Sequence, residues 1–104
     1  MSDNLPSGIK EFGIATDYVH DNIYIIGGKV GNSVIDLIYI FDTIDRKIYK
    51  SDRRLNVARC NAKITILNNK IYVIGGETSR GVVSNIEMVE IIDKYNINSP
   101  KIID

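Results

Sequence analysis

A six-residue motif occurs twice in this chain, and its spacing restricts the possible folds more than any other feature. Residues 23–28 read Ile-Tyr-Ile-Ile-Gly-Gly, and residues 71–76, which lie 48 positions further on, read Ile-Tyr-Val-Ile-Gly-Gly. The same shift aligns nine identical residues among the 25 positions from 22 to 46, so a whole structural unit repeats. Repeats of about 40 to 50 residues are typical of propeller blades and of helical arrays.

The composition of the unit favours strands over helices. Its apolar segments are short, rich in Ile, Val and Tyr, and bounded by Asp, Asn, Gly or Ser, while helical periodicity is weak. The predicted strands are residues 13–19, 23–28, 36–42 and 47–51 in the first unit and residues 60–67, 71–76 and 85–92 in the second. At most a short edge strand is expected to follow before Pro100. We therefore predict an all-β fold of about two four-stranded antiparallel blades, an incomplete β-propeller.

The order of these features resembles the kelch repeat. Each unit has a strand that ends in a double glycine, then a polar loop and an apolar strand that ends near Asp. In the first unit a later Arg follows. The motif residues are Tyr24, Gly27, Gly28, Tyr72, Gly75 and Gly76. The chain departs from the family where the outermost strand usually begins with Trp, because it has Ile48-Tyr49 and Asn96-Ile97 there. The resemblance divides the chain into a lead-in at residues 1–12, kelch blades at 13–59 and 60–98, and a tail at 99–104.

The double glycine is expected to be structural, because a residue without a Cβ allows close approach between strands. The alternative is a phosphate-binding turn at residues 27–31. That interpretation requires a helix directly afterwards, and the next segment reads as a strand.

Composition limits the other classes of function. Thirteen Lys and Arg balance thirteen Asp and Glu, so no overall charge attracts nucleic acid or an anionic membrane. The only histidine, His20, and the only cysteine, Cys60, are far apart in the sequence, so no metal or other cofactor is expected. The single cysteine and the lack of a signal-like N-terminus favour a cytoplasmic location.

Five acidic residues are candidates for acid/base chemistry, but their expected positions at strand ends and turns favour a structural role. They are Asp42, Asp45, Glu87, Glu90 and Asp93. The chain is therefore expected to be non-enzymatic, and a fragment of a propeller enzyme is the least favoured alternative because two blades do not enclose a central site.

The predicted contact surface for a protein partner consists of the loops at residues 29–33 and 77–84 together with four arginines. These arginines are Arg53, Arg54, Arg59 and Arg80, and Arg59 is expected to have a partly structural role as well. RNA is a less favoured partner for this basic patch, because no aromatic residues are interleaved with it.

Two blades are too few for a closed propeller, which has roughly four to eight. The outer faces of an isolated pair are expected to be uncovered, which allows self-association. The Ile- and Asn-rich character is similar to kelch proteins of poxviruses, whose full-length members carry an N-terminal BTB domain that recruits a cullin ubiquitin ligase. No BTB segment fits ahead of residue 13, so the resemblance implies a truncated viral protein that binds a host protein without recruiting the ligase. A decayed gene fragment without function is the alternative.

Overall fold

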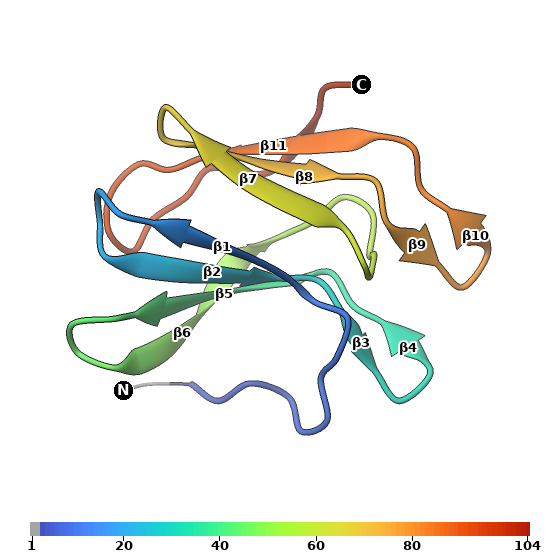
Figure 1. Cartoon of the computed structure of the whole chain (residues 1–104), viewed down its shortest axis with the longest axis horizontal. Coiled ribbons are helices and arrows are strands. Elements are labelled where there is room, and N and C mark those ends of the chain that lie inside the picture. Colours follow the sequence, from blue (N-terminus) through green and yellow to red (C-terminus); the bar gives the residue numbers. More distant parts are fainter. Residues whose placement is uncertain (1–2) are drawn as a thin grey trace.

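Each repeat unit folds into a four-stranded antiparallel sheet in the computed structural model, which describes residues 3–104 (Figure 1). The first sheet contains β1 (Gly13–Asp17), β2 (Asn22–Ile26), β5 (Leu37–Asp42) and β6 (Lys47–Arg54), in that order. The second contains β7 (Lys63–Leu67), β8 (Lys70–Ile74), β11 (Ile86–Glu90) and β12 (Lys101–Ile102), also in order. The prediction of an all-β fold with two blades that do not close into a ring is confirmed. Residues 1 and 2 of the predicted lead-in lie outside the described residues.

The two loops predicted after the double glycines contain short two-stranded ribbons. The first ribbon pairs β3 (Lys29–Val30) with β4 (Ser33–Val34), and the second pairs β9 (Glu77–Thr78) with β10 (Gly81–Val82). The ribbons occupy equivalent positions in the repeat, and both project from the same end of the sheets (Figure 1). This part of the molecule is called the ribbon end below.

Turn chemistry explains how β7 and β8 form a hairpin. Leu67 pairs with Lys70, so only Asn68 and Asn69 connect the two strands. Both residues have positive φ angles, 51° and 60°. Asn tolerates this backbone region, and two such residues form the tight turn whose twist matches that of paired strands.

The hydrophobic core lies between the two sheets. On one face of the first sheet, alternation buries the side chains of Tyr24, Ile26, Ile38 and Ile40, each at most 1% exposed. They belong to the same core cluster as Ile71, Val73 and Val89 of the second sheet, and Ile64 and Ile66 of β7 pack against this cluster. The two blades therefore share one core and do not have one each.

The outer face of the first blade is only partly covered. Ile14, which pairs with Ile25 on this face, is 56% exposed. Ile25 and Tyr39 point away from the shared core, yet they are only 7% and 4% exposed. Residues 3–12 run along this side of the sheet (Figure 1). The amide of Asp3 donates to the carbonyl of Ile48 over 2.6 Å, and Lys10 pairs with Lys29 through both backbone bonds.

The second blade ends differently from the expectation. Of residues 95–100, Ile97 forms only an isolated bridge with Ile91, and its side chain is buried in the core. The outer strand is β12, which pairs with Glu87 and Met88 and lies within residues 99–104, the segment predicted to be a tail. Among the described residues, no helix has the length and apolar character needed to cross a membrane.

The double glycines have the same unusual conformation in both blades. Gly27 and Gly75 have φ angles of 67° and 65°, and Gly28 and Gly76 have φ angles of 114° and 103°. A Cβ on Gly27 would lie 2.4 Å from the carbonyl oxygen of Arg59, and a Cβ on Gly76 would lie 2.6 Å from that of Cys60. These glycines allow the connection between the blades to pass directly against the ends of β2 and β8.

We expect Gly76→Ala to lower the free energy of unfolding by at least about 3 kcal/mol. The added Cβ would force the backbone near Cys60 to move, and alanine is strained at the positive φ of this position. Gly31→Ala is the matched control: it also has a positive φ, 59°, but no atom lies within 4 Å of its added Cβ. The control is expected to cost about 1 kcal/mol. Urea unfolding measures both, and equal losses would contradict the packing role of the double glycine.

Candidate functional site

The ribbon end carries a cleft of about 230 Å³ between the two ribbons. Lys29, Asn32 and Val34 line it from the first ribbon, and Glu77, Thr78 and Ser79 line it from the second. Glu11 and Cys60 complete the lining. Both predicted loop segments therefore contribute to one concave surface.

Three possible metal ligands meet in this cleft. One ligating atom each of Glu11, Cys60 and Glu77 lies within 4.8 Å of the others, the one such group found among residues 3–104. The side-chain amide of Asn61 donates to Glu11 over 2.8 Å and to Glu77 over 2.9 Å, so it bridges the two carboxylates. Sequence spacing gave no sign of this group, because backbone pairing of Cys60 with Glu77 and of Asn61 with Glu11 brings the residues together.

The Cys60 thiol is poorly suited to nucleophilic chemistry. It is buried, and burial raises its pKa, with Glu11 and Glu77 raising it further. The sulfur lies 3.6 Å from the carbonyl oxygen of Glu77, to which the thiol donates. Because the thiolate is the reactive form, a raised pKa keeps this cysteine unreactive.

Three of the four predicted contact arginines are exposed. Arg80 lies between the strands of the second ribbon, and Arg54 lies at the same end of the molecule, opposite the first residue of β5. Arg54 is 3.3 Å from Asp36, an exposed ion pair that contributes little to stability. Arg53 donates to the Ser99 hydroxyl over 3.1 Å.

Arg59 is buried, so its predicted contribution to a contact surface is wrong. Its side chain is 1% exposed, and one terminal nitrogen lies 2.6 Å from a carboxylate oxygen of Glu87. The guanidinium also donates to the side chain of Asn85 over 2.6 Å and to the carbonyl of Gly75 over 3.0 Å. A buried guanidinium is stable only with such a set of acceptors, and here the second blade supplies them.

Glu87 connects the same blade to the chain that enters it. It lies within β11, fully buried, although the sequence favoured a strand end or turn for it. Besides pairing with Arg59, its carboxylate accepts the backbone amides of Asn56 and Val57 over 2.7 and 3.0 Å. Comparison of the two units does not predict this ion pair, because the positions equivalent to Arg59 and Glu87 in the first unit are Glu11 and Tyr39.

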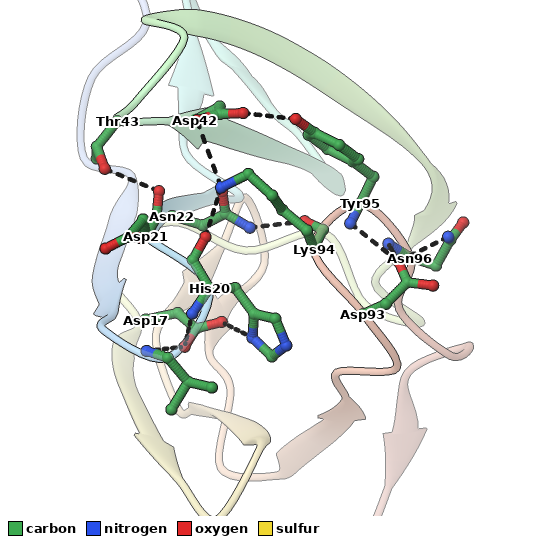
Figure 2. Close-up of polar contacts among 11 residues, drawn as sticks. Asp17, His20, Asp21, Asn22, Asp42, Thr43, Asp93, Lys94, Tyr95 and Asn96 are labelled. Atoms are coloured by element: carbon green, nitrogen blue, oxygen red, sulfur yellow. Dashed lines mark hydrogen bonds and ion pairs between the residues drawn. The ribbon is translucent and has the colours of Figure 1, made fainter.

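A polar network joins the blades at the end opposite the ribbons (Figure 2). The Tyr95 hydroxyl donates to the buried carboxylate of Asp42 over 2.6 Å, and the Lys94 ammonium lies 3.4 Å from the other carboxylate oxygen. The side chain of Asn22 donates to the Lys94 carbonyl over 2.6 Å. The turn after β11 is thereby attached to the ends of β2 and β5 in the first blade.

The ionisation of this network favours a structural role. The hydrogen bond from Tyr95 holds the pKa of Asp42 down at about 2, and two backbone amides and Lys94 act in the same direction. The same bond raises the pKa of Tyr95 above its ordinary value. At neutral pH the carboxylate is therefore ionised and the phenol protonated, and neither group is poised to exchange protons.

Residues 58–93 match the family described as Kelch motif. The match covers the second unit from the connection containing Arg59 to the turn after β11, and it supports the kelch repeat family for this chain. Among curated proteins, none matches the chain.

We expect Arg59→Met to lower the free energy of unfolding by about 3 to 5 kcal/mol, because it leaves the Glu87 carboxylate buried without a counter-charge. The double variant Arg59→Met/Glu87→Leu removes both charges and is expected to recover much of this loss. Urea unfolding of the three proteins provides the measurement. A double variant no more stable than the single one would show that the buried charge is not the cause.

Acid is expected to weaken the network at the other end. Folding lowers the pKa of Asp42, so the ionised carboxylate stabilises the fold fully above its pKa in the unfolded chain, about 4. This stabilisation is lost as the pH falls toward the folded-state pKa of about 2. Asp42→Asn should lower the unfolding temperature at pH 7 and flatten its dependence on pH between 4 and 2. The exposed neighbour Asp45→Asn is the control, and thermal melts from pH 2 to 7 are the measurement. An unchanged pH profile in Asp42→Asn would refute this assignment.

Proposed function

We propose that the chain is a non-enzymatic protein-interaction module that binds a protein partner through its ribbon end. The observation that supports this most is the arrangement of the two ribbons, which are equivalent in the repeat and project from the same end of the sheets (Figure 1). Residues of both ribbons line one cleft. The match to the Kelch motif supports the same function, since kelch repeats generally mediate protein interactions.

The chemistry of the ribbon end favours a partner segment that carries a carboxylate beside an apolar residue. Arg80 is exposed, and among the described residues its guanidinium has no ion pair. Val82, two residues further on, is 84% exposed. An arginine next to an exposed apolar side chain is a typical centre of binding energy in protein interfaces.

The buried carboxylates and the thiol support a non-enzymatic role, because they already form contacts that stabilise the fold. Asp42 accepts from Tyr95, Glu87 is paired with Arg59, and the Cys60 thiol is kept protonated by burial. None of these groups has the exposed, activated state that catalysis requires.

The finer proposal follows the resemblance to poxvirus kelch proteins. In it, the chain is a truncated viral kelch protein that acts in the host cytoplasm, binds a host protein and does not recruit a cullin ubiquitin ligase. Self-association is a second class of partner, and the exposed apolar side chains of the second sheet support it, among them Leu67 at 62% and Ile74 at 39%.

The ribbon-end proposal is tested by affinity capture with tagged chain, followed by affinity measurement on each captured partner. The double variant Arg54→Ala/Arg80→Ala should weaken binding at least about tenfold. Lys47→Ala is the matched control, because Lys47 is an exposed cation at the other end of β6 from Arg54. If every captured partner bound the double variant as tightly as the unaltered chain, the ribbon end would not be the contact surface.

A further inference from the structure

We infer that the end of the molecule opposite the ribbons binds a lipid surface with zwitterionic headgroups. This part, called the turn end, consists of the turns at residues 18–21, 43–46 and 92–96, which lie together at the left of Figure 1. The inference concerns a second surface, and it does not depend on the partner proposed for the ribbon end.

Four large apolar side chains of the turn end project into solvent. Their exposed fractions are 86% for Tyr18, 75% for Val19, 68% for Ile44 and 57% for Ile92. The first turn presents two of them because it has four residues, whereas the equivalent turn of the second blade has only Asn68 and Asn69. Exposed apolar side chains gathered at one end of a molecule mark a surface that contacts a protein or a membrane.

An aspartate in or next to each of these turns binds two of its backbone amides. The carboxylates accept these amides over 2.9 to 3.3 Å: Asp17 from Val19 and His20, Asp42 from Ile44 and Asp45, and Asp93 from Tyr95 and Asn96. Asp17 and Asp42 are themselves buried, so their carboxylates face the turn from inside the fold. These amides therefore do not depend on water.

Backbone carbonyls of the turn end also have internal donors. The carbonyl of Asp21 accepts the amide and the hydroxyl of Thr43 over 3.0 and 2.8 Å. The carbonyl of Asn96 accepts the amide of Ile92 over 2.9 Å, and the Lys94 ammonium donates to the carbonyl of His20. Contact with lipid removes water, and it is opposed by every backbone group left without a partner. The turn end meets this requirement for the groups named here.

The shape and the charges of the turn end favour a zwitterionic lipid surface. Its apolar side chains protrude from separate turns, and a fluid surface fills the space between them, whereas a protein partner needs a pocket for each. Exposed charges of both signs lie beside the tips, Arg46 and Lys47 with Asp21 and Asp45, so an anionic surface gains little attraction. The ring and hydroxyl of Tyr18 suit the boundary between headgroups and acyl chains.

The test is sedimentation of the full 104-residue chain with phosphatidylcholine vesicles over a range of lipid concentrations. Replacing about a third of the lipid by phosphatidylserine should change the affinity less than about twofold. The double variant Val19→Asp/Ile44→Asp should raise the lipid concentration for half-binding at least about tenfold, because charges replace two apolar contacts. Val82→Asp is the matched control at the ribbon end and should bind as the unaltered chain does. Circular dichroism checks that the variants fold.

Fluorescence gives a second measurement, because the chain has no tryptophan. The emission of Tyr18→Trp should move to shorter wavelength when phosphatidylcholine vesicles are added, and that of Val82→Trp should not. Lack of binding to phosphatidylcholine, binding only in the presence of phosphatidylserine, or equal binding by Val19→Asp/Ile44→Asp would overturn the inference. A captured protein that this double variant loses, without any vesicle binding, would also overturn it and assign the turn end to a protein partner.

Discussion

Arg59 holds the two blades together, and the rest of the structure depends on the position it fixes. Its backbone belongs to the first blade: the amide of Gly28 donates to its carbonyl over 2.9 Å, and its own amide donates to Ile35 over 3.2 Å. Its side chain belongs to the second blade, where it pairs with Glu87. A buried guanidinium is stable only when its acceptors are all in place. Because the backbone of Arg59 is bonded to the first blade and its acceptors lie on the second, the length of this side chain fixes the distance between the blades.

The position of the ribbon end follows from that constraint. The double glycines let the connection between the blades pass against the ends of β2 and β8, and the ribbons begin directly after those glycines. The cleft between the ribbons is therefore set by the same backbone that carries Arg59. At the opposite end, the contact of Tyr95 with Asp42 holds the second blade to the first, so the pair is fixed at both ends of the shared core.

The sequence predicted the blades well because strand alternation and the double glycine are local signals that occur twice. The sequence did not predict the ribbons, since two residues per strand are too few for a pattern. It did not predict β12 either, because a proline removes a ladder donor and usually marks the end of a strand, whereas Pro100 directly precedes β12. The burial of Arg59 was not predictable from the repeat, because its partner Glu87 aligns with Tyr39 in the other unit. The group formed by Glu11, Cys60 and Glu77 depends on long-range pairing and leaves no sequence signal.

Native-state amide hydrogen exchange tests most directly whether the two blades form one structural unit. Amides of β2 in the first blade and of β8 in the second both lie beside the shared core. The structure predicts that their slowest amides exchange with the same opening free energy, equal to that of global unfolding. Full protection in one blade together with markedly lower protection in the other would contradict it.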